Sequence, residues 1–337
     1  MRKYVLESGA SSLDHLKAVD CEAPTPGPGE VLIRVRACSL NYRDQLIVQG
    51  KYFGGTLAEP ITPLSDGAGE VAGVGEGVTR FKEGDRVAGI FFQKWRAGPA
   101  NPEQGPALGA VGAKGMLAEY VTLPEEGVVK IARHLSFEEA STLPCAGVTV
   151  WNALMCGRRP LRAGDCVLVL GTGGVSTLAL QIAHAAGAHV IATSSSDEKL
   201  ERARALGAAS LINYRKTPNW GAEAAKASNK GGADCVVEVG GAGTLAQSMQ
   251  AVGYNGEIAL IGVLTREGDT HPHPLMLKGA SIRGIFVGSA AMAIDLNHAL
   301  EVNGVKPAID RVFPFEEAAE AYRHQAAGAF GKVVIKI

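Results

Sequence analysis

The glycine-rich stretch at residues 171–176, GTGGVS, has residue types and spacing that fit one definite chemistry. It follows an apolar run at residues 166–170 and precedes small and apolar residues at helical spacing up to Ala186. Glycines between a strand and a helix permit a tight turn and let the backbone approach a pyrophosphate, which the free N–H groups of the helix start can bind. Ser176 replaces the last glycine of this fingerprint and is small enough for close helix–strand packing. We therefore predict a dinucleotide site at Gly171, Thr172, Gly173, Gly174 and Val175.

The residue after the second strand, 189–193, indicates which dinucleotide binds. NAD-binding units place Asp or Glu there to accept hydrogen bonds from the ribose hydroxyls, whereas this chain has Ser194. A carboxylate would repel a 2′-phosphate, but a hydroxyl can donate a hydrogen bond to it. Lys199, one helical turn on, and Tyr214-Arg215 could complete a phosphate pocket. We predict NADPH, rather than NADH, as the cofactor.

The same segment also fits a structural role. Ser195 and Glu198 have the spacing of a capping box at the start of a helix, which would leave Lys199 solvated. Both interpretations can hold together, and Ser195 stays among the predicted cofactor residues.

Composition excludes several other classes of function. The length of 337 residues is enough for two domains. The net charge of −1 argues against nucleic acid or an anionic membrane as the partner. The N-terminal segment lacks the apolar core of a signal peptide, and the six cysteines show no CxxC spacing, so we expect reduced thiols in the cytoplasm. No carboxylate or thiol accompanies His271 and His273, so we expect no metal there.

The order of elements predicts an α/β fold in which one domain is inserted into another. Residues up to about 120 contain short strands between Pro/Gly turns, at 31–37, 69–73, 86–90 and 118–122. The middle alternates helices with strands at 166–170, 189–193, 211–213, 234–239, 257–261 and 282–287, which indicates a doubly wound parallel sheet. The tail adds helices at 291–301 and 316–325 and a strand at 332–337. We expect a mostly β catalytic domain at 1–121 and 289–337, a nucleotide-binding domain at 122–288, and substrate in the cleft between them.

The order of motifs resembles the medium-chain dehydrogenase/reductase superfamily over essentially the whole chain. The motifs are PGEVL at 28–32, LNYRD at 40–44, GAGEV at 67–71, GDRV at 84–87, LPCAG at 143–147, the glycine turn and GKVV at 331–334. The resemblance implies a GroES-like catalytic domain around the Rossmann sheet.

Zinc alcohol dehydrogenases of this superfamily hold a catalytic metal with Cys, the His of a GHE motif, and a later Cys or Asp. The corresponding residues here are Asn41, Ser65 of Leu64-Ser65-Asp66, and Cys145. One thiol does not suffice for a catalytic zinc site, which needs three protein ligands. Residues 92–115 also lack the cysteines of the structural-zinc lobe, so we expect no metal.

The LNYRD and LPCAG motifs resemble the zinc-independent quinone oxidoreductase branch. This implies hydride transfer from NADPH to a quinone or to the β-carbon of an α,β-unsaturated carbonyl, where the developing oxyanion needs hydrogen-bond donors and a proton source. Tyr52 is similar in position to the active-site tyrosine of enoyl reductases, although it could simply pack at the cleft edge. Asn41 and Tyr42 are expected near the nicotinamide and the acceptor, as polar positioning groups.

Neighbouring residues fit structural roles. Asp44 could accept from the cofactor or cap a turn, and we favour the cap. Cys145 is expected to be a small core residue, because no histidine is placed to activate it. Ser65 and Asp66 are expected to be hydrogen-bonding remnants of a metal site.

The resemblance also implies further cofactor contacts, each with a plain structural alternative. Thr149 is similar to a threonine near the nicotinamide but could be an ordinary helix residue. Residues 286–288 resemble a segment whose backbone contacts the carboxamide, or else only continue a strand. Further candidates follow strand ends, where ligands gather in open α/β sheets. These candidates are Gly240, Gly241, Ile261, Gly262 and Val263, beside Phe286 and Val287 of the segment 286–288.

Two rival functions remain open at this stage. One is an alcohol or aldehyde dehydrogenase of the same superfamily, and the other is an NADPH-binding structural or regulatory protein without turnover. The resemblance further implies a homodimer, joined along the apolar edge strand at 282–287 that would otherwise lie unpaired.

Overall fold

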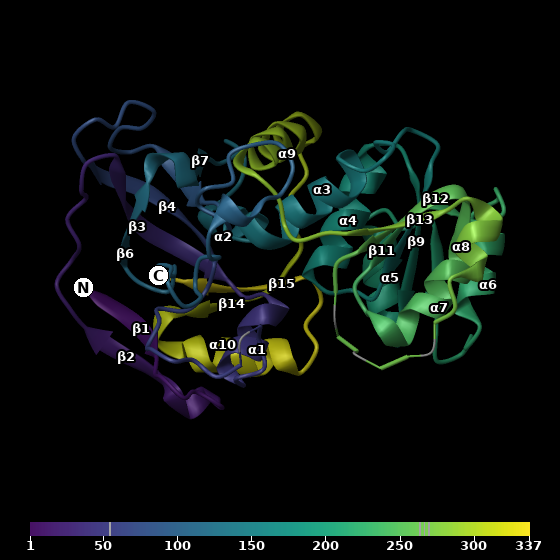
Figure 1. Cartoon of the computed structure of the whole chain (residues 1–337), viewed down its shortest axis with the longest axis horizontal. Helices are drawn as coiled ribbons and strands as arrows, with labels where there is room; N and C mark the ends of the chain where they lie inside the picture. Colours follow the sequence, from purple (N-terminus) through teal and green to yellow (C-terminus); the bar gives the residue numbers. More distant parts are fainter. Residues whose placement is uncertain (54, 263, 266, 269) are drawn as a thin grey trace. The chain divides into compact units, whose positions relative to one another are not determined.

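Strand β3 (Glu30–Ser39) organises the first of two structural units in this computed structural model, which describes every residue except 54, 263, 266 and 269 (Figure 1). Inward-facing residues alternate along the first half of β3, as expected for a strand with one buried face. β3 pairs with β4 (Asp66–Val74), β6 (Tyr120–Pro124) and β15 (Lys332–Lys336). The remaining members of this seven-stranded sheet are β5 (Arg86–Gly89), β7 (Val128–Lys130) and β14 (Ile309–Pro314).

The two units are formed by residues Met1–Val148 with Gly288–Ile337, and by Thr149–Val287. Residues 122–148 therefore lie with the first unit, whereas we expected the boundary after residue 121. The reason is strand pairing. β6 pairs with β3 and β7 pairs with β5, so both strands belong to the sheet of the first unit. The sequence analysis also missed a small antiparallel sheet of β1 (Arg2–Leu6) and β2 (Leu16–Asp20).

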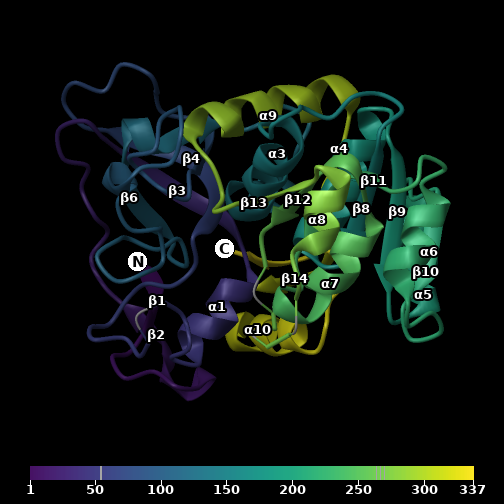
Figure 2. The ribbon, with the colours of Figure 1, turned by 45° about the vertical axis from the view of Figure 1, so that its right-hand side comes forward.

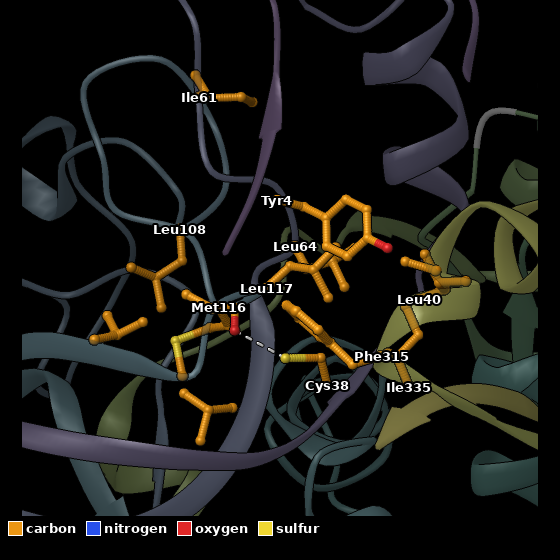
Figure 3. Close-up of a cluster of buried hydrophobic side chains, with 14 of the residues drawn as sticks. Tyr4, Cys38, Leu40, Ile61, Leu64, Leu108, Met116, Leu117, Phe315 and Ile335 are labelled. Atoms are coloured by element: carbon orange, nitrogen blue, oxygen red, sulfur yellow. Dashed lines mark hydrogen bonds between the residues drawn. The ribbon is translucent and has the colours of Figure 1, made fainter. Parts of the chain in front are cut away.

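The first unit has its own hydrophobic core, part of which Figure 3 shows. Leu40 and Leu64, which precede two of the candidate site residues, are at most 1% exposed within it. The Cys38 thiol donates to the Met116 carbonyl at 2.9 Å in the same cluster (Figure 3). The helices of this unit are α1 (Tyr42–Val48), α2 (Phe137–Ala140), α9 (Ala290–Asn303) and α10 (Ala318–Ala326).

The second unit is the predicted doubly wound parallel sheet, with strand order β10-β9-β8-β11-β12-β13 (Figure 2). All five residues of β8 (Cys166–Leu170) are buried, as a strand covered on both faces requires. The other strands are β9 (His189–Ser194), β10 (Ser210–Asn213), β11 (Ala233–Glu238), β12 (Val252–Leu260) and β13 (Ser281–Gly284). The helices are α3 (Val148–Met155), α4 (Gly174–Ala185), α5 (Asp197–Ala205), α6 (Trp220–Ala227), α7 (Ala242–Ala251) and α8 (His273–Lys278).

The predicted fold class is confirmed, but one strand is shorter than expected. β13 ends at Gly284, and the expected strand 282–287 leaves the sheet there, after a last hydrogen bond from the Ile285 N–H to the Leu260 carbonyl of β12. Among the described residues, no helix has both the length and the apolarity to span a membrane.

Two glycines of β4 provide a matched test of the β3–β4 pairing. A Cβ at Gly69 would lie 2.1 Å from the Arg34 carbonyl oxygen, whereas one at Gly73 would meet nothing nearer than 3.9 Å. We expect Gly69→Ala to lower the free energy of unfolding by about 1–3 kcal/mol, because the strands must separate. Gly73→Ala should change it by less than about 0.5 kcal/mol. Equal effects of the two variants in chemical denaturation would contradict this account of the pairing.

Candidate active site and cofactor-binding turns

The glycine turn after β8 leaves the start of α4 open. Gly171 has a φ of 71°, which favours glycine, and its N–H donates to Thr193 Oγ1 at 3.2 Å. Ser176 Oγ donates to the Leu170 carbonyl at 2.6 Å and ties the helix to the strand, as its small size predicted. Gly173 precedes α4 and has no side chain to cap it. The first N–H groups of this twelve-residue helix therefore suit a phosphate.

The end of β9 brings Ser194 and Tyr214 together. Ser194 is 4% exposed, and its carbonyl accepts from the Tyr214 N–H at 3.1 Å. Its Oγ accepts from the Ser196 N–H at 3.3 Å. Ser196 then caps α5 by accepting from the Lys199 N–H at 3.3 Å. The capping residue is thus Ser196, which corrects the alternative based on Ser195 and Glu198, because β9 extends to Ser194 and the helix begins at Asp197.

A buried glutamate, which the sequence analysis missed, shapes the turn after β11. Glu238 is fully buried, and its Oε1 accepts from the N–H groups of Gly240 and Gly241 at 2.7 and 3.0 Å. The Gly240 carbonyl accepts from Thr265, so both backbone groups of this predicted cofactor residue bind within the protein. The available signal was a Glu that ends an apolar run, Cys235–Val237, and stands two residues before the glycine pair Gly240-Gly241.

The turn after β12 requires close approach of two backbones. A Cβ at Gly262 would lie 1.8 Å from the Val239 carbonyl oxygen, so only glycine fits there. The N–H groups of Ile261 and Gly262 both donate to the Glu238 carbonyl, at 2.9 and 3.1 Å. The neighbouring candidate Val263 lies outside the described residues. Ile261 and Gly262 thus lie at the strand end predicted for them.

Val287 has an unusual backbone conformation. Its φ is 57°, a left-handed value that costs a β-branched residue roughly 1–3 kcal/mol. Asn152 Nδ2 holds it by donating to the Val287 carbonyl at 2.7 Å, and Arg283 Nη1 donates to Asn152 Oδ1 at 2.9 Å. Strained residues cluster at ligand-binding positions, and the cofactor contact of this segment stays a prediction. Phe286 beside it is 47% exposed, and Thr149 is buried at 3%.

In the first unit, a buried lysine ammonium contacts the predicted site residue Asn41. Lys332 is 3% exposed, and its Nζ donates to the Leu40 carbonyl at 2.8 Å and to Asn41 Oδ1 at 2.7 Å. Asp66 Oδ2 lies 3.6 Å from the same Nζ. Asp66 also accepts from Ser65 Oγ at 2.9 Å and from Ser39 Oγ at 3.4 Å. Ser65 and Asp66 are hydrogen-bonded as expected, with the lysine as an additional partner.

The donor set at this place is poorly suited to zinc. Of the three residues at the family's ligand positions, only Cys145 is of a ligand type, and no three His, Cys, Asp or Glu side chains gather anywhere in the described part of the chain. Cys145 lies in a π-helical turn, Leu143–Gly147, directly before α3. Burial, with a contribution from Asp66, raises the pKa of the Cys145 thiol, so it stays protonated.

Asp44 caps α1, as the sequence analysis favoured. Its Oδ2 accepts from the Asn41 N–H at 2.7 Å, while its Oδ1 is buried without a partner among the described residues. Burial raises the pKa of Asp44 to about 6, although the Arg43 charge and the Asn41 N–H oppose this. Helical periodicity buries Arg43 and Asp44 and leaves Tyr42 47% exposed.

Tyr52 lies beside a buried arginine that the sequence analysis did not single out. The Arg43 guanidinium carbon is 5.0 Å from the centre of the Tyr52 ring and 4.7 Å from that of Phe91. Arg43 Nη1 donates to the Leu108 carbonyl at 2.8 Å. Burial raises the pKa of Tyr52, with opposition from Arg43, so the phenol keeps its proton and can donate it.

The raised pKa of Asp44 predicts a pH effect on stability. Since the folded protein must ionise this carboxyl at a higher pH than the unfolded chain does, Asp44 destabilises the fold increasingly as pH rises through 4 to 6. The quantity to compare is the free energy of unfolding of Asp44→Asn minus that of the unmodified protein. This difference should increase by about 2 kcal/mol from about pH 4.5 to about pH 8. Denaturation at both pH values measures this, with Asp295→Asn on the exposed side of α9 as the control. A relative stability of Asp44→Asn that does not change with pH would contradict the shift.

Family models match both parts of the chain. The zinc-binding dehydrogenase family matches residues 174–301, and the alcohol dehydrogenase GroES-like domain matches residues 27–133. A zinc-type alcohol dehydrogenase-like protein of Schizosaccharomyces pombe is 46% identical and covers 99% of both chains. The quinone oxidoreductase of Sus scrofa is 29% identical over 94% of this chain and 92% of its own.

Solved structures agree with these matches. The crystal structure of an NAD-dependent alcohol dehydrogenase superimposes with a TM-score of 0.90 at 34% identity, covering all of both chains. The chain belongs to the medium-chain dehydrogenase/reductase superfamily of oxidoreductases, which bind a nicotinamide cofactor.

Proposed function

We propose that this protein is an NADPH-dependent reductase that transfers hydride to a quinone or an α,β-unsaturated carbonyl without zinc. The observation that carries the proposal is the buried Lys332 ammonium bonded to Asn41, at the place where zinc enzymes of the family hold their metal. A cation is already bound there by the protein itself. The names of relatives point both to zinc-type alcohol dehydrogenases and to quinone oxidoreductases.

A zinc ion would compete with this ammonium. Zinc needs three ligands of N, S or carboxylate type, and the oxygens of Asn41 and Asp66 already face Lys332. A metal placed among them would add a divalent charge close to a buried monovalent one. We infer that reduction proceeds without Lewis-acid assistance.

The cofactor is held by the second unit in this proposal. The uncapped start of α4, with Gly171, Thr172, Gly173, Gly174 and Val175, takes the pyrophosphate. Ser194, with Ser195, Lys199 and Tyr214, takes the 2′-phosphate. Thr149, Ile261, Gly262, Phe286 and Val287 take the nicotinamide end. The structure supports the choice of NADPH because β9 ends in a hydroxyl and not in a carboxylate.

The first unit holds the acceptor. Bound NADPH supplies the hydride, and this chain supplies the groups that stabilise the oxygen on which negative charge develops. Tyr52 donates the proton. Burial raises the pKa of Tyr52, but the Arg43 guanidinium beside its ring opposes this shift and stabilises the phenolate that is left. Tyr42, half-exposed at the start of α1, contacts the acceptor from the solvent side.

A homodimer is the proposed assembly. β13 (Ser281–Gly284) is the edge strand of the parallel sheet, and a second copy would cover it. Because the strand ends at Gly284, the pairing segment is shorter than the sequence alone suggested.

The first experiment measures NADPH oxidation by chelator-treated protein with quinones, enones and simple aldehydes. Turnover of quinones or enones without metal supports the proposal. Activity on aldehydes alone, restored by zinc, would mean an alcohol or aldehyde dehydrogenase. Tight NADPH binding with no turnover of any acceptor would mean a binding protein.

Tyr52→Phe should lower kcat by about 10²–10⁴-fold, while Tyr254→Phe, at an exposed tyrosine of β12, should leave it unchanged.

The choice of cofactor is tested at the end of β9. Ser194→Asp should raise the KM for NADPH at least about tenfold, or about 1.4 kcal/mol, through repulsion of the 2′-phosphate, and should leave the KM for NADH similar or lower. Ala209→Asp serves as the control, because it adds the same charge at an exposed position just before β10. Ala209 lies beside the start of β9, whereas Ser194 lies at its end. Equal use of NADH and NADPH by the unmodified protein would overturn the assignment.

A further inference from the structure

The pairing of Lys332 with Asn41 fixes the orientation of the Asn41 amide. An ammonium has three N–H donors and no acceptor, so the atom of Asn41 that faces it at 2.7 Å must be Oδ1. A second donor goes to the Leu40 carbonyl at 2.8 Å, and the Asp66 carboxylate forms an ion pair with the same ammonium at 3.6 Å. Rotation of the amide by half a turn would place its NH₂ group against the ammonium, donor against donor. Charge therefore settles an orientation that geometry alone leaves ambiguous.

The consequence is an unused donor. Asn41 is 9% exposed, and its Nδ2 is buried without a hydrogen-bond partner among the described residues. Buried donors in native proteins nearly always have a partner, so an orphaned one calls for a ligand. The lysine cation on Oδ1 withdraws electron density from the amide and makes its N–H groups stronger donors.

We propose that Asn41 Nδ2 is the hydrogen-bond donor to the carbonyl oxygen of the acceptor, and that Lys332 is the positioning residue that aims it. The proposal rests on the proposed reductase function and adds the group that binds the oxyanion. Hydride adds to the β-carbon, the electrons of the C=C bond shift so that the carbonyl oxygen becomes an enolate oxygen, and NADPH becomes NADP⁺. The α-carbon then takes a proton from Tyr52, the C=O bond re-forms, and the Tyr52 phenolate regains a proton from solvent water. Asn41 bonds more strongly to the enolate than to the carbonyl, which lowers the barrier.

Asn41→Asp isolates this donor. The aspartate keeps the shape of the side chain and an oxygen for Lys332, but places a second oxygen where the NH₂ group was. We expect kcat with an enone to fall by about 10²–10³-fold, while the KM for NADPH and the thermal stability stay close to those of the unmodified protein. Asn303→Asp, at an exposed position near the end of α9, adds the same charge and should leave kcat unchanged.

A spectroscopic readout separates this proposal from the proposed function. The absorption band of 4-dimethylaminocinnamaldehyde, a chromophoric enal, shifts to longer wavelength when its carbonyl accepts a hydrogen bond. We expect a red shift with the unmodified protein in the presence of NADP⁺, and its loss in Asn41→Asp. The shift would survive even if the protein reduced no quinone or enone, so failure of the function leaves this result interpretable. No shift with the unmodified protein, or an equal shift in Asn41→Asp, would overturn the proposal.

The role of Lys332 is tested by a double-mutant cycle. If Lys332 acts through Asn41, Lys332→Met should lower kcat in the unmodified background and have little further effect in Asn41→Ala. Lys332→Met leaves Asp66 buried without its cation and could prevent folding. The pair Lys332→Met with Asp66→Asn removes both charges and serves as the second variant. Additive losses of kcat across the cycle would show that Lys332 does not position Asn41.

Discussion

The contact between the Lys332 ammonium and the oxygens around it is the interaction on which the first unit depends. It joins the start of β15, the end of β3 and the start of β4, because Leu40 and Asn41 directly follow β3 and Asp66 begins β4. A charge buried to this degree is tolerated only with near-complete hydrogen bonding and an opposite charge. Removing one partner would leave the other buried and unpaired, so the group is maintained as a whole. The polar side chains of the site are therefore held in place by electrostatics and not only by packing.

The second unit uses the same device in a different setting. Arg283 donates to the Asn152 oxygen, so the Asn152 NH₂ group must face the other way, where it holds the Val287 carbonyl. Arg283 is in turn fixed by Glu257 on β12, at 2.8 Å. In both units a cation sets the orientation of an asparagine amide, and the amide then presents a donor in a chosen direction. In the second unit the donor holds a strained backbone, and in the first it has no partner among the described residues.

The sequence predicted the parts of the structure that depend on local pattern. The apolar runs of β8 and β9, the glycine turn between them and the small Ser176 are local signals, and the doubly wound sheet followed from them. The missed features depend on residues far apart in the chain. Lys332 is the first residue of an otherwise apolar run in β15, and nothing nearby in the sequence indicates that its ammonium is buried. Arg43 is a charged residue on the buried face of α1. Its burial is explained only by its contacts with the rings of Tyr52 and Phe91, which come from other parts of the chain. The strand predicted at 282–287 was too long, because the pattern of apolar residues continues past the end of β13 at Gly284. Ile285 and Val287 are buried although they are not part of the strand.

The separation of Asn41 and Lys332 along the chain has a consequence for folding. The whole of the second unit lies between them, so the sheet of the first unit closes only after this insertion has been made. The second unit has its own core and its strands are neighbours in sequence more often than not, so it can fold before that closure. β6 can pair with the first half of β3 before the insertion is made, but Ala37–Ser39 of the same edge must wait for β15. An unpaired edge segment is where misassembly between copies begins. Asn152 and Val287, near the two ends of the inserted unit, are hydrogen-bonded to each other, so a folded second unit holds the two segments of the first unit close together where they leave it.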